Sequence, residues 1–202
     1  MASPRDYKNT IVPNWCPGCG DYGIQNAISA VCAKKGWANE DITLISGIGC
    51  SSRIGGYQYC YGAHTTHGRA LPFAQGIKCA NKDQHMIVCS GDGDSYAIGL
   101  GHAMHAMKRN MDITYLVFDN QVYGLTKGQT SPASDKGFVT KTTPDGNPLT
   151  PLDAPAMALA AGATFVAQAY AIDSKTMINV IERAVDHKGF SYVNIFTPCV
   201  TF

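Results

Sequence analysis

The sequence contains little charge. Asp, Glu, Lys and Arg make up 15% of its 202 residues, whereas a typical soluble domain has about 25%. The 16 Lys and Arg residues nearly balance the 15 Asp and Glu residues, which leaves a net charge of +1. This balance argues against nucleic acid and against an anionic membrane as partners. Glutamate is especially scarce, because Glu40 and Glu182 are the only two in the chain.

Long apolar segments are also missing. No run of about 18 uncharged apolar residues occurs, which argues against a membrane-spanning helix. The first ten residues, MASPRDYKNT, lack the apolar stretch of a secretory signal, so we expect a cytoplasmic protein. Disorder is excluded because 45% of the residues are hydrophobic and few are charged. The length suits a single domain with a sizeable core.

Two common nucleotide-binding motifs are missing as well. Residues 47–52 (GIGCSS) begin like a GxGxxG loop but lack its last glycine, and the Gly-Lys-Ser/Thr of a P-loop does not occur. Neither a Rossmann dinucleotide site nor a P-loop is therefore expected.

Cysteine, in contrast, is frequent. The eight cysteines occupy positions 16, 19, 32, 50, 60, 79, 89 and 199. In a chain without a secretory signal, they indicate metal or redox chemistry rather than disulfides. One pair is close in sequence, because Cys16-Pro-Gly-Cys19 forms a turn-rich segment near the N-terminus.

Alternating apolar and amphipathic segments predict the fold class. Apolar runs predict strands over residues 42–46, 86–90, 113–118, 164–169 and 192–196. Helical patterns predict helices over residues 22–35 (with Asp21 as N-cap), 68–80, 96–108, 154–161 and 174–187. This alternation indicates an α/β fold with a doubly wound, mostly parallel sheet. Residues 121–150 show no periodicity, and so long a loop is typical of a functional segment or lid.

The GDGD sequence at residues 91–94 follows a predicted strand directly and opens a helix. Its glycines allow the backbone to approach an anion, and the free N–H groups at the helix start favour a phosphate. A carboxylate beside a phosphate requires a bridging cation, so Asp92 is a candidate ligand for Mg²⁺ or Ca²⁺. The alternative is a tight strand-to-helix turn without a ligand.

The next predicted strand ends at Asp119-Asn120. Because parallel strands end at the same edge of a sheet, the Asn120 amide oxygen can reach the crevice occupied by Asp92. The Val122 carbonyl would add a third oxygen. This pair of motifs is similar to the thiamine diphosphate signature, GDG followed by Asn-Asn, with Asp119 in place of the first Asn.

Two further cysteines are predicted at this edge. Cys50 follows the strand over residues 42–46, and Cys199 follows the last strand in Thr-Pro-Cys. With Cys16 and Cys19 they form a set of four, mostly in turns whose N–H groups can point at cluster sulfides. A structural zinc site is the alternative, and the residues alone do not decide between the two. Of the remaining cysteines, Cys60 is unassigned and three are expected to be buried: Cys32, Cys79 and Cys89.

Several motifs together resemble the 2-oxoacid:ferredoxin oxidoreductases. In chain order they are WCPGCG, GIGCSSR, THGRA, GDGD, NQVYGLT, GQTSP and TPC. They are similar to the thiamine-diphosphate-binding beta subunit, most of all to the 2-oxoglutarate type, over roughly residues 10–202. We therefore expect residues 1–202 to form a single thiamine-diphosphate-binding domain with an N-terminal cluster-binding arm. This family usually continues beyond the TPC motif, so we expect its C-terminal tail to be absent.

The resemblance implies thiamine diphosphate, Mg²⁺ and one [4Fe-4S] cluster as cofactors. The implied cluster ligands are Cys16, Cys19, Cys50 and Cys199. The implied Mg²⁺ ligands are Asp92, Asn120 and the carbonyl of Val122. The implied contacts of the thiamine cofactor are Ile48, Gly49, Cys50, Ser51, His67, Gly91, Asp92, Gly93, Asp94 and Leu125.

The resemblance also implies a reaction. A 2-oxoacid, expected to be 2-oxoglutarate, loses CO₂, its electrons pass through the cluster to ferredoxin, and coenzyme A takes the acyl group. Thiamine catalysis needs a carboxylate, nearly always a Glu, against the aminopyrimidine ring. Glu40 precedes the first strand, at the wrong end of the sheet, and Glu182 lies within a late helix. We therefore predict that an alpha subunit supplies this Glu and that the chain alone is inactive.

Basic residues near the same edge are candidates for the substrate carboxylate. Arg53 is favoured because a guanidinium can pair with a carboxylate through two hydrogen bonds. Lys127 and Arg69 follow, and each of the three has the alternative of a surface cation or an internal ion pair. His67 is assigned a phosphate or substrate contact, while the role of His64 is left open.

One predicted helix carries side chains that invite a functional interpretation. His102 and His105 could be mistaken for a metal pair, but no third ligand is evident, so packing is expected. Met104 and Met107 are expected in the core.

Two other function classes stay open. A thiamine-dependent decarboxylase or ligase without a cluster would not need the four cysteines at the sheet edge. A zinc-stapled interaction module would not need the GDGD motif and Asn120. Within the family, pyruvate or a broad range of 2-oxoacids is the alternative substrate.

Overall fold

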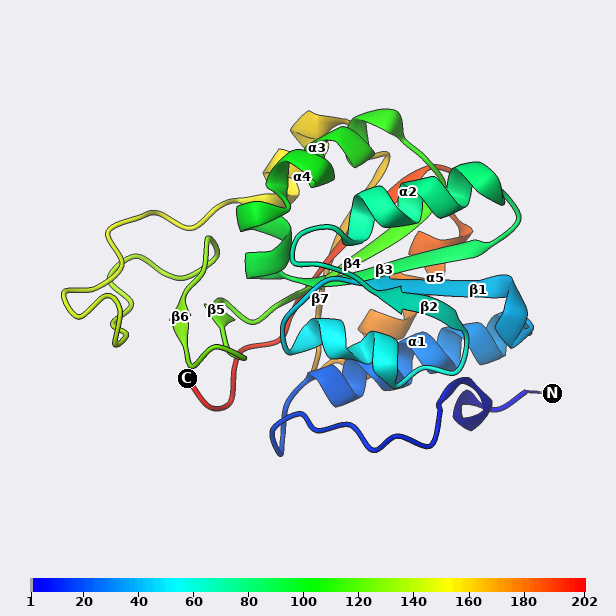
Figure 1. Cartoon of the computed structure of the whole chain (residues 1–202), viewed down its shortest axis with the longest axis horizontal. Coiled ribbons are helices and arrows are strands. Elements are labelled where there is room, and N and C mark those ends of the chain that lie inside the picture. The colour runs from blue at the N-terminus through cyan, green and yellow to red at the C-terminus, as the bar shows by residue number, and fades with distance from the viewer. Residues whose placement is uncertain (1) are drawn as a thin grey trace.

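A six-stranded sheet lies at the centre of the computed structural model, which describes residues 2–202 (Figure 1). The strand order is β2-β1-β3-β4-β8-β7, and every neighbouring pair is parallel. The strands are β1 (Ile42–Ser46), β2 (Tyr61–His64), β3 (His85–Gly91), β4 (Ile113–Asp119), β7 (Phe165–Tyr170) and β8 (Phe190–Phe196). The parallel α/β sheet expected from the sequence is therefore confirmed.

Helices cover both faces of this sheet (Figure 1). They are α1 (Asp21–Lys35), α2 (Ala70–Ala80), α3 (Leu100–Arg109), α4 (Ala154–Ala161) and α5 (Ser174–Asp186). The apolar sides of α1 and α5 share one core with the sheet, and those of α2, α3 and α4 share the other. The sheet is therefore doubly wound. Within residues 2–202, each helix is too short or too polar to cross a membrane.

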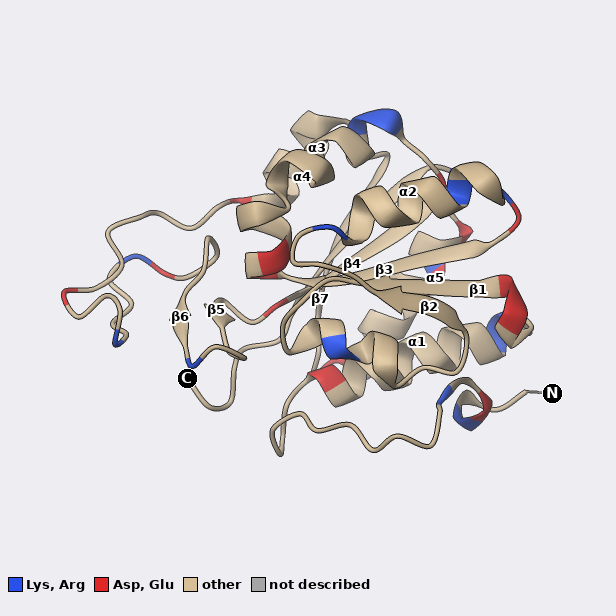
Figure 2. Cartoon of the chain, in the orientation of Figure 1, with Lys and Arg blue, Asp and Glu red and all other residues tan. Residues whose placement is uncertain are grey.

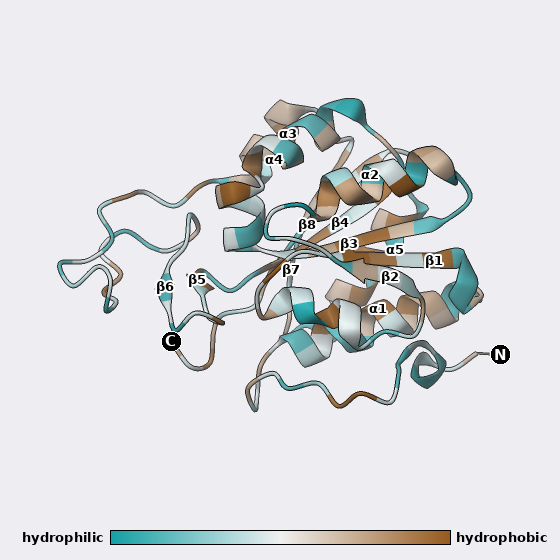
Figure 3. Ribbon diagram, in the orientation of Figure 1, coloured by the Kyte–Doolittle hydropathy of each residue, from teal (hydrophilic) through white to brown (hydrophobic). Residues whose placement is uncertain are grey.

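The middle strands are buried on both faces. All five residues of β1 and all seven of β4 are buried, which explains why both sequences are nearly continuous apolar runs. Figure 3 shows the hydrophobic residues on the strands and on the inner sides of the helices. Burying one such side chain, for example Phe118, contributes about 1.5–3 kcal/mol.

Short elements fill the connections. The 3₁₀ turns are Pro4–Tyr7, Asn39–Asp41 and Ser51–Gly56, and a single π-helical turn, Asp94–Ile98, precedes α3. The strands β5 (Val122–Tyr123) and β6 (Gln129–Thr130) form a small antiparallel hairpin. Charged residues lie mainly in these connections and at the ends of elements, as Figure 2 shows.

The strand order opens a crevice between β1 and β3. The connection after β1 leads to β2 on one side, whereas the connection after β3 leads to β4 on the other. Because these two connections diverge, the carboxyl ends of the adjacent strands are left uncovered, and ligands of doubly wound sheets bind at such a point.

The structure differs from the sequence predictions at the short β5–β6 hairpin, which lies in the segment predicted to be a loop, and at three further elements. Strand β2 was missed because it is an exposed edge strand without an apolar run. The helix predicted over residues 96–108 is divided at Gly99, whose backbone lies against Gly68: a Cβ on Gly68 would meet the Gly99 nitrogen at 2.7 Å. Asp21 is the first residue of α1, and Gly20 is its N-cap.

Three side chains that we expected to be buried are exposed. Cys79 lies on the outer side of α2, and Met104 and His105 lie on the outer side of α3. The inward side of α3 is formed by Ala103, Ala106 and Met107, so the expectation for Met107 is confirmed. Both helices pack through a narrow stripe of residues, which leaves their other apolar side chains in solvent.

Candidate active site

A cavity of about 250 Å³ opens at the carboxyl ends of β1, β3 and β4. Its wall comes from the connections after these three strands and from His67, which precedes α2. Every residue predicted to contact the thiamine cofactor lines the cavity, as do the three predicted magnesium ligands. Tyr123, Gly124 and Thr126 line it as well and were not predicted.

Asp92 is a buried carboxylate in this wall, only 1% exposed. Its Oδ2 accepts a hydrogen bond from the hydroxyl of Ser131, in the long loop after β6. Burial raises the pKa of Asp92 to about 7, and the nearby Asp119 adds to the rise. A bound cation would favour the ionised carboxylate, so Asp92 has the surroundings expected of a metal ligand.

Asn120 and Val122 follow β4 at the same wall. The Val122 N–H donates to Oδ1 of Asn120 at 3.1 Å, which fixes the amide and leaves its oxygen a second lone pair for a ligand. Asp119, in contrast, faces the protein interior, where its Oδ2 accepts a hydrogen bond from Asn194 at 3.0 Å. The position at which the chain departs from the Asn-Asn signature therefore lies outside the cavity wall.

Asp94 joins three turns around the cavity. Its Oδ1 accepts hydrogen bonds from the N–H groups of Ile48 at 3.0 Å and of Gly68 at 2.7 Å. The same oxygen lies 2.8 Å from Nδ1 of His67. We assign the hydrogen to Nδ1, since a carboxylate only accepts. The Nε2 atom of His67 is thus the ring nitrogen that remains for a ligand.

The glycines of the GDGD motif are required by close packing. A Cβ on Gly91 would lie 2.8 Å from the Ser51 hydroxyl, and a Cβ on Gly93 would overlap the ring of Tyr123. The Tyr123 hydroxyl also donates to the Gly93 carbonyl at 3.4 Å. Larger residues at these two positions would displace the cavity wall.

The four cysteines of the predicted set lie together beside the cavity. A Cβ on Gly124 would lie 3.4 Å from the sulfur of Cys50 and 3.9 Å from that of Cys199. Burial raises the pKa of Cys50 to about 11, with Cys199 and Cys16 among the further causes. Burial likewise raises the pKa of Cys19 to about 12, and Cys50 contributes. Buried thiols of this kind are difficult to ionise without a bound cation.

These sulfurs are neighbours, but they do not converge on one point. Among residues 2–202, no three Cys, His, Asp or Glu side chains lie close enough together to hold a single metal ion. Cys16 is the most exposed of the set, and the Thr201 hydroxyl donates to its sulfur at 3.2 Å.

Trp15 connects the N-terminal arm to the cavity. Its Nε1 donates to the carbonyl of Cys50 at 2.6 Å, and its ring packs edge-on against Tyr22 and Tyr57. This contact holds the turn that carries Cys16 against the turn that carries Cys50. Trp15 immediately precedes Cys16, but its role was not predicted.

Comparison with known proteins identifies the family. Residues 47–195 match the family model "Thiamine pyrophosphate enzyme, C-terminal TPP binding domain". The chain is 44% identical over 198 residues to the 2-oxoglutarate oxidoreductase subunit KorB of Mycobacterium tuberculosis, covering 98% of this chain and 53% of that protein. It is 44% identical over 191 residues to the 2-oxoacid:ferredoxin oxidoreductase subunit beta of Saccharolobus solfataricus, covering 94% and 63%.

A solved structure is also similar. It is 2-oxoglutarate:ferredoxin oxidoreductase from Magnetococcus marinus with 2-oxoglutarate, coenzyme A and succinyl-CoA bound. The TM-score is 0.98 at 44% identity, covering 100% of this chain and 69% of that chain. The chain belongs to the beta-subunit family of 2-oxoacid:ferredoxin oxidoreductases. The motif resemblance is therefore confirmed, as is the thiamine-diphosphate-binding fold. The chain spans about half to two thirds of the length of the two curated relatives described above.

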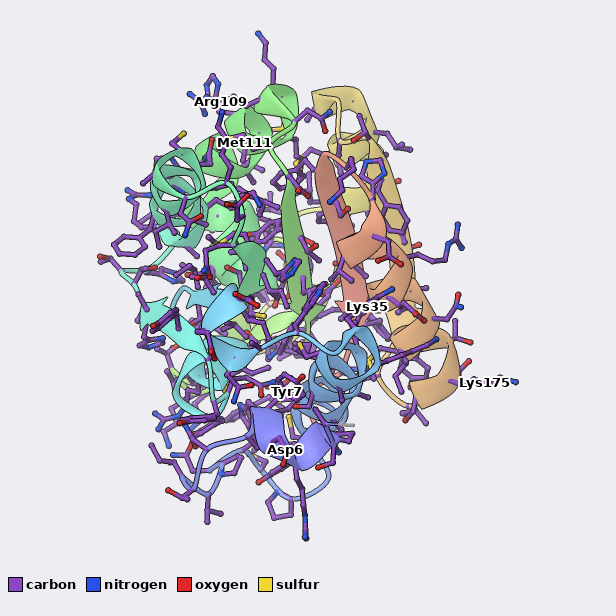
Figure 4. All side chains as sticks on the ribbon, turned by 90° about the vertical axis from the view of Figure 1, so that its right-hand side faces the viewer. Asp6, Tyr7, Lys35, Arg109, Met111 and Lys175 are labelled. Carbon is purple, nitrogen blue, oxygen red and sulfur yellow. The ribbon has the colours of Figure 1, made fainter. Side chains whose placement is uncertain are left out.

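Neither glutamate of this beta-subunit chain lines the cavity. Glu40 lies in the Asn39–Asp41 turn, which precedes β1 at the opposite edge of the sheet. Glu182 pairs with Lys34 at 2.6 Å and with Lys35 at 3.3 Å, between α5 and α1. Figure 4 labels Lys35 on α1 beside α5. Both glutamates thus lie outside the cavity wall.

The three basic residues that are candidates for binding the substrate carboxylate lie around the cavity but do not line it. Arg53 is exposed, and its Nε donates to the Tyr57 hydroxyl at 3.0 Å. Arg69 donates to the carbonyl of Ile98 at 3.2 Å. Lys127 is exposed, directly after the lining residues 124–126, with an unusual φ of +88°. A positive φ in a residue other than glycine is strained, and such strain is found mainly at functional sites.

His64 lies outside the cavity wall. It ends β2, and its Nδ1 is 3.0 Å from the Ser46 hydroxyl, which ends β1. This contact gives His64 a structural partner at the edge of the sheet.

Proposed function

We propose that the chain acts in the cytoplasm as the thiamine-diphosphate-binding beta subunit of a coenzyme-A-acylating 2-oxoacid:ferredoxin oxidoreductase, with 2-oxoglutarate as its substrate. One observation supports this most directly: Cys50 both lines the cofactor cavity and belongs to the cysteine set. The names of the M. tuberculosis and M. marinus proteins favour 2-oxoglutarate. The name of the S. solfataricus protein keeps a broader range of 2-oxoacids as the alternative.

Mg²⁺ would bind to Asp92, Asn120 and the Val122 carbonyl. The donor set fits, because all three groups are oxygens, as Mg²⁺ requires, and they line one cavity. Burial raises the pKa of Asp92 to about 7, so a cation at this carboxylate offsets an unfavourable buried charge. The Ser131 hydroxyl donates a hydrogen bond to Oδ2 of Asp92 and so holds the carboxylate in place.

Thiamine diphosphate would lie along residues 48–51, 91–94 and 125, in a cavity whose glycines leave room for it. When bound, it supplies a nucleophilic carbon for attack on the 2-oxo group, and the cluster accepts single electrons. His67 offers Nε2 to the bound cofactor, and Asp94 orients that ring through Nδ1. The N–H groups at the start of the π-helical turn Asp94–Ile98 favour the diphosphate.

The [4Fe-4S] cluster would bind to Cys16, Cys19, Cys50 and Cys199, so residues 1–202 would act as one domain with an N-terminal cluster-binding arm. A cluster fits the spread of the four sulfurs, because each thiolate binds its own iron. A single zinc ion would need them to converge at about 2.3 Å. All eight cysteines are free thiols, which suits a reducing compartment.

Metal content tests the cluster. The protein purified without oxygen should be brown and contain about four iron and four sulfide per chain. Cys50→Ser should lose much of this iron while Cys79→Ser, at an exposed thiol outside the set, should retain it. Zinc without iron in the anaerobic protein would contradict the proposal and favour a zinc-stapled interaction module instead.

Substrate preference tests Arg53. We predict that Arg53→Ala raises KM for a dicarboxylic 2-oxoacid at least tenfold, because one lost charged hydrogen bond costs about 1.5–3 kcal/mol and about 1.4 kcal/mol is already tenfold. KM for pyruvate should change little, because pyruvate has no second carboxylate. Tyr57→Phe is the control, because it keeps the guanidinium and removes its present partner, the Tyr57 hydroxyl, together with the bonds of that hydroxyl to Asn14. Equal changes for both substrates would exclude Arg53 from the substrate site.

The catalytic glutamate would come from the alpha subunit, since neither glutamate of residues 2–202 lines the cavity. Ferredoxin would receive the electrons.

A further inference from the structure

Buried polar atoms without a hydrogen-bond partner gather at the two proposed cofactor sites. Such atoms are uncommon in folded proteins, because burying them unpaired is costly. Within residues 2–202 they are Oδ2 of Asp94, Oδ1 of Asp119, Oδ2 of Asp21, Oγ of Ser52 and Oγ1 of Thr197. The first two belong to the thiamine and magnesium side, since Asp94 lines the cavity and Asp119 precedes Asn120. The other three each lie two positions from a cysteine of the predicted set, so a ligand of these cysteines is the expected partner.

Thr197 is the hydroxyl residue of this group whose surroundings are best defined. It follows β8 directly, is 3% exposed, and its N–H donates to the Asp119 carbonyl at 2.8 Å. Its Oγ1 lies against Gly20, where an added Cβ would overlap the hydroxyl. Gly20 directly follows Cys19, and the threonine itself is two positions before Cys199. The hydroxyl therefore lies between the chain segments that carry these two cysteines.

The neighbouring Asp21 shows that polar groups at this place border the cysteine sulfurs. Burial raises the pKa of the Cys19 thiol to about 12, and the charge of Asp21 is the next cause. Burial raises the pKa of the Cys50 thiol to about 11, and Asp21 is again the next cause. Because Oδ2 of Asp21 and Oγ1 of Thr197 both lack a partner, these two groups do not pair with each other. The hydrogen of the Thr197 hydroxyl is thus left for another acceptor.

We propose that the Thr197 hydroxyl donates a hydrogen bond to a sulfur of the [4Fe-4S] cluster and thereby raises the reduction potential of the cluster. This inference rests on the proposed function, which assigns a cluster to the four cysteines. Hydrogen bonds to the sulfurs are among the factors that set the potential of a cluster. Such a bond becomes stronger when the cluster gains an electron, because the negative charge on the sulfur increases. The hydroxyl therefore stabilises the reduced form more than the oxidised form.

An anaerobic redox titration of the chain in complex with its alpha subunit tests this role. Dithionite supplies the single electron that the cluster gains, and electron paramagnetic resonance measures the reduced fraction. Thr197→Val removes the hydroxyl and should lower the equilibrium constant for reduction about tenfold, which is a shift of about 59 mV toward lower potential. Thr197→Ser keeps the hydroxyl and should change this constant less than threefold. Iron is measured in each variant beside the potential.

Thr114→Val is the matched control. Thr114 is also buried, 6% exposed, but its hydroxyl donates to the Ala184 carbonyl at 3.4 Å, near the start of β4. Its replacement should leave the potential unchanged. Thr197→Ala is a second variant, because it removes the hydroxyl without adding a methyl group against Gly20. It should lower the equilibrium constant for reduction by the same factor as Thr197→Val.

Three results would overturn the proposal. The first is an unchanged potential in Thr197→Ala with its full iron content, and the second is an equal shift in Thr197→Ser. The third is loss of iron from Thr197→Ala, which would assign the hydroxyl to the assembly of the cluster and not to its potential. Failure of the proposed function is a separate result, because the unaltered complex would then contain no cluster at these cysteines.

Discussion

Asp92→Asn is expected to abolish Mg²⁺-dependent binding of thiamine diphosphate. The substitution keeps the shape of the side chain and an oxygen that can accept from Ser131, but it removes the one charged donor of the proposed metal site. Loss of groups that only support a ligand already lowers metal affinity about 10–100-fold, so we expect at least a hundredfold loss here. Titration of cofactor affinity by Trp15 fluorescence, with Mg²⁺ or with a chelator, measures it.

Ser131→Ala is the matched control. It removes the hydroxyl that holds Asp92 but leaves the ligand oxygens in place, so the loss of affinity should be about tenfold, at the lower end of the range for a supporting group. Equal losses in the two variants would show that Asp92 acts through the loop and not through the metal.

Although Asp92→Asn should weaken the binding of Mg²⁺, it should stabilise the folded protein when no metal is present. Burial raises the pKa of Asp92 to about 7 from 3.8. Between these values the folded chain binds more protons than the unfolded chain, so the contribution of Asp92 to stability is lost as pH rises toward 7. At pH 8 and without Mg²⁺, Asp92→Asn should therefore raise Tm. A lower Tm under these conditions would mean that another group already offsets the cost of burying the charged Asp92 carboxylate.

The sequence predicted the interior of the fold better than its periphery. Two elements were predicted with the bounds that the structure shows: the strand over residues 42–46 and the helix over residues 154–161. A strand that is buried on both faces and a helix that buries small residues each leave a strong pattern in the sequence. Strand β2 left no such pattern, since its residues are mostly exposed. The interruption at Gly99 depends on a contact with Gly68, 31 positions away in sequence, which periodicity does not reveal.

The site residues that could be predicted are those that follow the strands of the sheet. Asp92, Asn120 and Cys50 follow neighbouring parallel strands, so their meeting at one edge required only the strand assignments. Three further residues come from loops whose course depends on tertiary contacts: Ser131, Tyr123 and Trp15. Apart from their motifs they have no distinguishing feature in the sequence. The orientation of Arg53 toward Tyr57 could not be predicted for the same reason.

The second large expected effect concerns the carboxylate that thiamine catalysis needs against the aminopyrimidine ring. A thiamine cofactor bound by this chain alone would meet Asp92 and Asp94 as the acidic residues of the cavity wall. Asp92 would be committed to Mg²⁺, and Oδ1 of Asp94 already accepts three hydrogen bonds. Oδ2 of Asp94 accepts no hydrogen bond within residues 2–202, but it lies against the backbone of Gly47, so neither carboxylate is placed to act on the aminopyrimidine ring. Glu40 is at the other edge of the sheet, and Glu182 is held by Lys34 and Lys35.

The chain without its partner is therefore expected to bind thiamine diphosphate and Mg²⁺ but not to oxidise 2-oxoacids. In the complex, replacing the responsible alpha-subunit glutamate with glutamine should lower kcat roughly 10²–10⁴-fold, the usual contribution of a positioned acid or base. Glu182→Gln in this chain is the control and should leave kcat unchanged, since Glu182 only joins two helices through exposed ion pairs. Reduction of ferredoxin or of a viologen dye at saturating 2-oxoglutarate measures the rate. Because thiamine diphosphate binding is measured separately, turnover by the isolated chain would contradict the need for a second carboxylate without questioning the cofactor site.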